Sequence, residues 1–268
     1  MVVLVCFLIT KPVFANEFLI VPVVLTQEQQ KQLALKIEQR ETAGKDNNLT
    51  YWNKNEDFPS FGIGHFIWLP NNQNATFKET FPELVSFLKK KSQPPRWLTD
   101  LSPFKLPWQT RQEFYDDFNK PKLLQLRNWL KKTKLLQAEF IYQRFLQDLN
   151  VAQKKLSNNQ RQKINRHLKN LISTPQGFFA LIDYASFKGV GNNDTETYHY
   201  NGKTVGWGLI DVLLNMPKKT EDSLNGFIHS AKVVLKRRTD YASKDNTKQN
   251  EKKWLKGWYY RLDSYTKY

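Results

Sequence analysis

The residue of this sequence best placed to act as a proton donor is Glu41. Leu33, Ile37 and Glu41 are spaced at i, i+4 and i+8, so they fall on one face of a predicted helix that runs from Thr26 to Glu41. Thr26 lies three residues before Gln29, which is the spacing of a capping box. A carboxyl group on the apolar face at the C-terminal end of a helix would be desolvated, and it would meet the negative end of the helix dipole. Both effects favour the protonated form, which protonation of a glycosidic oxygen requires.

The same periodicity also fits a simpler interpretation of this helix end. Glu41 could face solvent and pair with Arg40 or Lys45, and Gly44 would then stop the helix as an ordinary C-terminal signal. The spacing alone leaves both interpretations open.

Two glycines interrupt a strand-like stretch downstream of this helix, in the segment Ser60 to His65, which reads SFGIGH. Glycine weakens a strand interior and usually marks a bend, a bulge or the close approach of another group. Residues 45–70 are rich in Asn, Asp, Gly and aromatic residues, which predicts a short hairpin or small sheet with irregular turns.

The rest of the chain predicts helices, so the expected fold class is α+β, mostly helical, with one small sheet near the N-terminus. The loop from Gly189 to Gly206 is polar and contains glycine, which makes it a candidate substrate loop. The helices are expected at about 82–91, 110–118, 121–132, 134–155, 158–172, 175–188, 206–216, 220–243 and 252–265.

Residues 1–15 predict a secretory signal peptide, because an apolar run from Val2 to Ile9 is followed by Val13, Phe14 and Ala15, a small-residue cleavage pattern. The alternative is a buried N-terminal strand. Cys6, the sole cysteine, lies in this segment, so a cleaved chain would carry no thiol. We therefore expect a periplasmic or secreted protein, with residues 16–268 as a single domain and no membrane span.

The net charge of +16 favours polyanionic partners such as nucleic acid, anionic lipid or an acidic cell-wall polymer, unless it serves only solubility. The four histidines show no metal-ligand spacing, and the sequence has no phosphate-binding loop and no serine-hydrolase elbow. No metal or cofactor is expected.

The helix ending in Glu41, followed by Ser60 to His65, resembles the start of phage-type lysozymes and of lytic transglycosylases in the same superfamily. The resemblance implies a lysozyme-like fold with a small β subdomain at about 45–70 and a helical lobe. It makes Glu41 the catalytic acid and Ser60 the residue that holds a water or the substrate. Gly62 and Gly64 would let sugar approach the backbone, with His65 beside them.

Almost the whole mature chain resembles a group of uncharacterised secreted bacterial proteins related to that superfamily, through WNKNEDFPSFGIGHFIW, ALIDYASFKGVG, GWGLIDVL and WLKGWYYRL. Two positions depart from the expected patterns. Thr50 stands where phage-type lysozymes carry an Asp, and Val190 stands where the secreted proteins would carry a Glu. Glu56 or Asp57, near the strand, would then be the carboxylate that stabilises the oxocarbenium-like transition state, if any second carboxylate does. Lytic transglycosylases need only one essential Glu.

The second motif, around Lys188, ends a predicted helix and turns at Gly189, which fits a plain helix C-cap. On the functional interpretation, Tyr184 and Lys188 would line the cleft opposite Glu41. Trp207 could stack on a sugar or lie in the core. Further along the chain, a helical stripe predicts packing by Trp254, Trp258 and Leu262.

The function expected from these features is cleavage of glycan strands of peptidoglycan, by a muramidase or a lytic transglycosylase, in a monomeric enzyme. Two alternatives remain. One is a non-catalytic binding protein for cell-wall glycan on a degenerate lysozyme scaffold. The other is a basic protein that binds single-stranded nucleic acid, which export would exclude.

Overall fold

A computed structural model describes most of the chain, and the predicted signal peptide and Cys6 lie outside the described residues. The described ranges are 25–71, 78–191, 197–218, 222–242 and 251–267.

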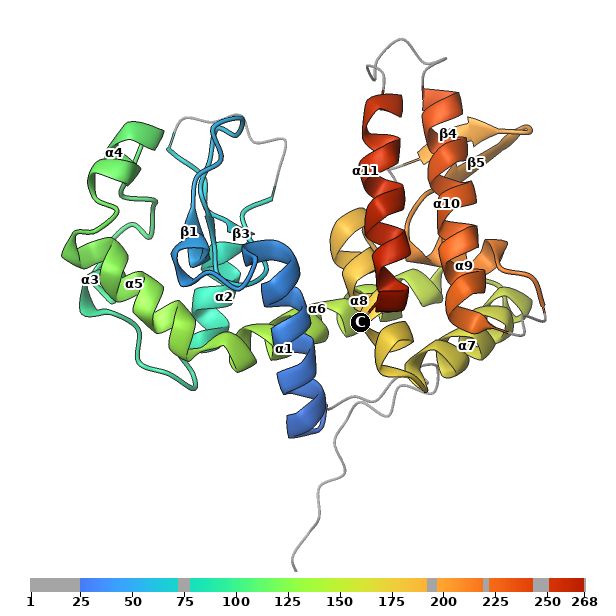
Figure 1. The fold of residues 1–268 in the computed structure, drawn as a ribbon, viewed down its shortest axis with the longest axis horizontal. Coiled ribbons are helices and arrows are strands. Elements are labelled where there is room, and N and C mark those ends of the chain that lie inside the picture. The colour runs from blue at the N-terminus through green and yellow to red at the C-terminus, as the bar shows by residue number, and fades with distance from the viewer. Residues whose placement is uncertain (1–24, 72–77, 192–196, 219–221, 243–250, 268) are drawn as a thin grey trace, which may run out of the picture.

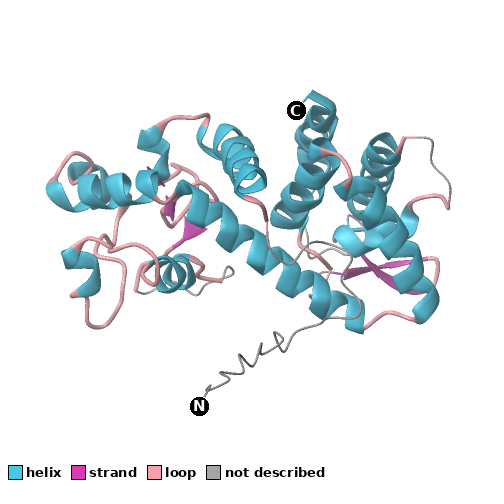
Figure 2. Ribbon diagram, turned by 90° about the horizontal axis from the view of Figure 1, so that it is seen from below, coloured by secondary structure: helices cyan, strands magenta, loops and turns pink. Residues whose placement is uncertain are grey.

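Two lobes are joined by one long helix, α6 (Lys134–Lys154), which runs from one lobe to the other (Figures 1 and 2). The first helix, α1 (Gln27–Thr42), packs against α6 and also contacts α8 (Pro175–Lys188). Both lobes therefore share α6 as a common wall, and α1 lies where they meet.

The first lobe contains the three-stranded antiparallel sheet, in the order β1-β2-β3, and four helices. Aromatic rings fill its core: Phe61 lies 4.6 Å from Phe81 and 5.9 Å from Trp68, measured between ring centroids. The elements are η1 (Asp46–Leu49), β1 (Thr50–Tyr51), β2 (Ser60–Phe61), β3 (Phe66–Ile67), α2 (Phe81–Leu88), α3 (Arg96–Thr99), α4 (Arg111–Asp116) and α5 (Pro121–Lys132).

The second lobe is built from helices packed around α8 and α10, with one two-stranded hairpin at its edge (Figure 1). Its elements are α7 (Asn158–Ile172), α8, β4 (Thr197–Tyr200), β5 (Lys203–Gly206), α9 (Leu209–Asn215), α10 (Ser223–Ala242), α11 (Lys252–Asp263) and η2 (Ser264–Lys267).

The coarse prediction is confirmed: the described chain is mostly helical, with small antiparallel sheets, and each predicted helix is present within a few residues of its expected bounds. The predicted loop from Gly189 to Gly206 is wrong in part, because β4 and β5 form a hairpin there. Asn201 and Gly202 turn the chain between the two strands with φ values of 47° and 71°. An Asn-Gly pair suits the left-handed backbone of a tight hairpin turn.

Helix α1 begins and ends largely as the sequence predicts. The backbone N–H of Gln29 donates to the Thr26 hydroxyl, and the N–H of Thr26 donates back to the Gln29 side chain, which completes the capping box. Leu33 and Ile37 are buried. Ala43 then takes a left-handed conformation with φ 53°, and Gly44 follows with φ 69°, so the helix stops just after Glu41.

In the part of the chain that the structure describes, no helix has both the length and the apolar character needed to cross a bilayer.

Candidate functional site

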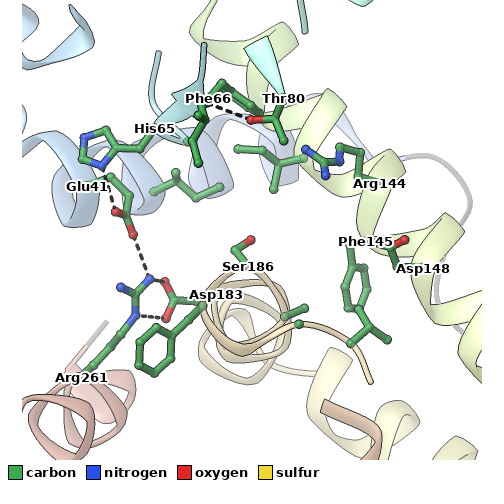
Figure 3. Close-up of a pocket in the computed structure, with 18 residues that line it drawn as sticks. Glu41, His65, Phe66, Thr80, Arg144, Phe145, Asp148, Asp183, Ser186 and Arg261 are labelled. Atoms are coloured by element: carbon green, nitrogen blue, oxygen red, sulfur yellow. Dashed lines mark hydrogen bonds and ion pairs between the residues drawn. The ribbon is translucent and has the colours of Figure 1, made fainter. Parts of the chain in front are cut away.

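A cavity of about 540 Å³ lies between the two lobes, and both contribute to its wall (Figure 3). The end of α1, the turn between β2 and β3, the middle of α6, the end of α8 and one residue of α11 meet there. The lining residues are Ile37, Glu41, Gly64, His65, Phe66, Ile67, Thr80, Ile141, Arg144, Phe145, Asp148, Asp183, Ala185, Ser186, Phe187, Gly189, Val190 and Arg261.

Glu41 lies at one end of this cavity, with its side chain 26% exposed. Its Oε1 accepts a hydrogen bond of 2.8 Å from Nη2 of Arg261, and its Oε2 lies 3.5 Å from Nδ1 of His65 (Figure 3). The expected position on the inner side of α1 is present, but the surroundings are polar. The ion-pair partner is Arg261, from a helix 220 residues away, and not Arg40 or Lys45.

Asp183 also binds the Arg261 guanidinium, and only 4% of its surface is exposed. Nε and Nη2 of Arg261 donate to its two carboxylate oxygens at 2.9 and 2.7 Å, and the Tyr265 hydroxyl donates to Oδ2 at 2.6 Å. Nε of Arg40 lies 3.3 Å from Oδ1. Two carboxylates and two guanidinium groups thus form one network that links α1, α8 and α11.

Opposing effects act on the Arg261 guanidinium. Burial by itself would lower the pKa of Arg261, but the charge and hydrogen bonds of Asp183, together with the charge of Glu41, raise its pKa above the usual value. Arg261 is therefore a permanent cation beside Glu41.

His65 adopts a backbone conformation that is uncommon for a residue with a side chain, with φ 48°. Burial lowers the pKa of His65, and the charges of Glu41 and Glu56 only partly oppose that effect. Its Nε2 is buried and has no hydrogen-bond partner within the described residues. Positions held in sparsely populated conformations cluster at functional sites, and His65 lines the cavity beside Glu41.

Gln137 of α6 fixes the turn that carries His65. Its Oε1 accepts a hydrogen bond from the backbone N–H of Ile63 at 2.9 Å, and its Nε2 donates to the carbonyl of Leu130 at 2.6 Å. Gly62 has φ 73°, and a Cβ there would lie 2.3 Å from the Gln137 oxygen. The close approach that this glycine allows is therefore that of a protein side chain from α6, not that of a sugar.

Gly64 does line the cavity, and a Cβ there would meet the Phe66 ring at 2.9 Å. Ser60 does not line it: the Ser60 side chain is buried, and its hydroxyl donates to the carbonyl of Tyr51 at 3.5 Å. Glu56 and Asp57 are exposed and lie outside the lining residues.

Thr50 and Val190, which depart from the motifs that the sequence resembles, have different surroundings. Thr50 is fully buried, and its hydroxyl accepts a hydrogen bond of 3.0 Å from Arg127, away from the cavity. Val190 is buried and lines the cavity.

Tyr184 and Trp207 belong to the core of the second lobe and do not line the cavity. The Tyr184 hydroxyl donates to the carbonyl of Trp207 at 2.8 Å, and Trp207 is stacked on Tyr198 beneath the Arg238 guanidinium. Lys188 also lies outside the lining, with its Nζ 3.3 Å from the centre of the Trp258 ring.

The predicted packing stripe of α11 holds only in part. Leu262 is fully buried and Trp258 is partly buried against the core, but Trp254 is 57% exposed.

Sequence reasoning missed several cavity residues, and some of them carried a signal. Asp183 interrupts the apolar run FFALIDYA, and a charged residue in a buried stripe must be paired. Arg261 lies next to Leu262 in the aromatic stretch of α11. Arg144, Asp148 and Ser186 had no comparable signal, because their positions follow only from how α6 and α8 face each other.

Comparisons of this chain with protein families, with curated proteins and with solved structures find no match. A function therefore has to be inferred from the site itself. Among the described residues, no three His, Cys, Asp or Glu side chains are grouped so that they could hold a metal ion.

Proposed function

We propose that this chain is a lysozyme-like enzyme that cleaves β-1,4 glycosidic bonds of peptidoglycan outside the cytoplasm. The observation that carries the proposal is the position of Glu41. It lies in the last turn of α1, faces a cavity between two lobes, and lies against the glycine-containing turn that bears His65. A cavity of about 540 Å³ is large enough for sugar units, because ligand sites commonly span roughly 300–1,000 Å³.

A mechanism with one carboxylate fits this cavity best. Of the other carboxylates among the described lining residues, Asp183 is held by Arg261 and Tyr265, and Asp148 lies at the opposite end from Glu41 (Figure 3). We therefore favour a lytic transglycosylase reaction. Glu41 would give its proton to the glycosidic oxygen as the bond from that oxygen to C1 breaks. The sugar's own 6-hydroxyl would then bond to C1 and return its proton to Glu41.

Arg261 suits the second half of such a reaction. Its Nη2 donates to Oε1 of Glu41 at 2.8 Å and would keep the carboxylate in position while the 6-hydroxyl delivers its proton. Glu41 would thus alternate between acid and base.

Replacement of Glu41 by Gln tests the proposal, because the amide keeps the shape of the side chain and removes the proton donor. Loss of general acid catalysis typically costs about 10²–10⁴-fold in rate. Turnover of purified peptidoglycan, with mass analysis of the products, should fall by that amount while thermal melting shows a folded protein. Anhydro sugar products from the wild type would identify the transglycosylase reaction, and reducing sugars would identify a hydrolase. Undiminished turnover in folded Glu41→Gln would refute the mechanism.

A second candidate is a non-catalytic protein that binds cell-wall glycan, and the ion pair between Glu41 and Arg261 favours it. One oxygen of Glu41 is already engaged by Arg261 and is therefore not open to a glycosidic oxygen. If the wild type binds peptidoglycan from several wall types but releases no soluble sugar from any of them, this candidate replaces the enzyme.

Action outside the cytoplasm is proposed from the apolar start of the sequence, with cleavage expected after Ala15. N-terminal sequencing of exported protein should find Asn16 as the first residue. A soluble cytoplasmic chain that retains Met1 would contradict the cell-wall substrate as well as the signal peptide.

A further inference from the structure

The cavity has a second polar feature, and its residues differ in kind from those around Glu41. Around Glu41, every charged group of the network has a partner of opposite sign: Arg261 and Arg40 face Asp183, and Arg261 also faces Glu41. Further along the cavity, Arg144 extends from α6, and its guanidinium points back toward the end where Glu41 lies (Figure 3).

The charge of Arg144 is not compensated within the described residues. Its guanidinium carbon lies 5.7 Å from the centroid of the Phe140 ring. No described carboxylate lies within ion-pair distance of it, and that includes Asp148, one turn further along α6. A partly buried guanidinium that lines a cavity presents planar donors suited to a carboxylate.

Ser186 supplies a second donor on the facing wall. It lies near the end of α8 and is exposed to the cavity, and its hydroxyl has no hydrogen-bond partner in the described part of the chain. Phe145 adds apolar surface on the α6 side (Figure 3). A cation, a hydroxyl donor and an aromatic ring therefore surround the space beyond Glu41.

We propose that Arg144 and Ser186 form a subsite for a carboxylate carried by the glycan strand, so that the cavity selects acidic amino-sugar polymers over neutral ones. This inference rests on the proposed function, because it assigns the neighbouring subsite to the same bound strand. In peptidoglycan the carboxylate can come from the lactyl ether of alternate sugars or from the peptide attached to it. A carboxylate on a short apolar stem matches a guanidinium placed beside an aromatic ring.

Binding is measured by calorimetry in the Glu41→Gln protein, which should hold strands without cleaving them. The ligands are peptide-free strands with free lactyl carboxylates, the same strands with each carboxylate converted to a neutral methylamide, and strands that keep their peptides. We expect the free carboxylate to bind roughly 10- to 100-fold more tightly than the methylamide, as for a hydrogen bond to a charged group. Preferential binding of the peptide-bearing strands alone would assign the carboxylate to the peptide.

Three further substitutions are compared in the same protein. The preference is the ratio of the affinity for the carboxylate strand to the affinity for the methylamide strand. Arg144→Gln should bring this ratio close to one, and Ser186→Ala should reduce it by a smaller factor. Arg96→Gln is the matched control, because it removes the same charge from an exposed position on α3 and should leave the preference intact.

An unchanged preference in folded Arg144→Gln, or an equal loss of affinity for both ligands, would overturn the subsite. Turnover of whole peptidoglycan by the wild type is measured in parallel, which separates the two proposals. If the wild type cleaves peptidoglycan but shows no preference for the carboxylate strand, only the subsite proposal is refuted. A wild type that neither binds nor cleaves any of these strands removes the proposed function and the subsite with it.

Discussion

Asp183 and Glu41 bind the same guanidinium but differ in what surrounds them. Asp183 is 4% exposed and is contacted by Arg261, Tyr265 and Arg40, whereas the Glu41 side chain is 26% exposed and faces the cavity. The buried acid therefore holds Arg261 in place, and the more exposed acid is left with an oxygen turned toward His65. At this site the structural carboxylate and the candidate reactive carboxylate are adjacent but separate.

The first prediction follows from that difference. Asp183→Asn leaves the Arg40 and Arg261 guanidinium groups close together around a neutral amide, and loss of one partner of a buried ion pair costs about 3–5 kcal/mol. Urea unfolding should show a loss of that size. Glu41→Gln is the control, because in that variant Arg261 remains paired with Asp183. Its free energy of unfolding should change by less than about 1 kcal/mol, as expected for a partly exposed pair. Equal losses in the two variants would contradict this division of roles.

Two histidines make the stability of the protein depend on pH. His167 on α7 is 1% exposed, and both of its ring nitrogens lack hydrogen-bond partners in the described structure. Burial, followed by the charges of Lys163 and Arg166, lowers the pKa of His167, and burial likewise lowers the pKa of His65. Each folded-state pKa thus lies below that of the unfolded chain, about 6.5.

As the pH falls below about 6.5, the unfolded chain binds these protons before the folded protein does. The stability that the neutral rings provide is therefore present above that pH and is lost as the pH falls through the folded-state pKa values. The free energy of unfolding should be lower at pH 5.5 than at pH 7.5. In His167→Gln the difference between the two pH values should shrink, whereas His199→Gln, on the exposed face of the β4–β5 hairpin, should leave it unchanged. Denaturant titrations at both pH values measure these free energies. An undiminished difference in His167→Gln would contradict the prediction.

At the scale of secondary structure, the turn between β2 and β3 is held by a helix from outside its own sheet. The side-chain oxygen of Gln137, on α6, accepts a hydrogen bond from the N–H of Ile63 and occupies the space that a Cβ at Gly62 would need. The position of His65 in the cavity therefore depends on α6, which also carries Arg144. A change at this contact should displace the turn and the wall of the cavity together.

Gly62→Ala tests this contact. It adds a Cβ 2.3 Å from the Gln137 oxygen and also strains a backbone with φ 73°. Gly202→Ala is a suitable control, because φ is 71° there but no atom lies within 4 Å of the added Cβ. Backbone strain alone costs about 1–3 kcal/mol, so Gly62→Ala should be clearly more destabilising than Gly202→Ala in thermal melting and should reduce any glycan turnover. A similar loss in both variants would mean that only the backbone conformation matters.

The secondary structure could largely be predicted from the sequence, and the reasons differ between elements. The start of α1 is predictable from the capping pair Thr26 and Gln29, and the starts of α5 and α8 from a proline in the first turn. Local sequence is therefore sufficient to predict where these helices begin. The β4–β5 hairpin was missed although Asn201 and Gly202 form a recognised turn signal.

The candidate site was predictable only where it is local. Glu41 and the turn with His65 are close in sequence, and both line the cavity. The partner of Glu41 is 220 residues away, and no periodicity relates the two positions. The sequence leaves Tyr184 and Trp207 open between a cleft and the core, because aromatic residues suit both sugars and cores, and only tertiary packing distinguishes these roles.

At the scale of the whole molecule, charge and architecture act together. The chain carries a net charge of +16, and α6 joins two lobes around an open cavity. Long-range attraction would concentrate such a protein on an anionic surface, whereas the cavity would act only on the strand that enters it.

Salt separates these two contributions. The Debye length falls from about 10 Å at 0.1 M to about 3 Å at 1 M salt, so the attraction between exposed charges should be largely screened over this range. Sedimentation of the protein with purified wall sacculi should decrease markedly as salt rises. Retention that does not change with salt would mean that contacts inside the cavity, and not the overall charge, hold the protein on the wall.

The network around Asp183 also sets an order of events during synthesis. Glu41 and Asp183 leave the ribosome before α11, which carries Arg261 and comes after every other element that lines the cavity. Folding can begin at the N-terminus while the chain grows. Until α11 is present, Asp183 lacks Arg261, which donates to both of its carboxylate oxygens. The network of Asp183, Arg261 and Glu41 can form only once that helix has been translated. Docking of α11 is therefore the step that completes the lining of the cavity.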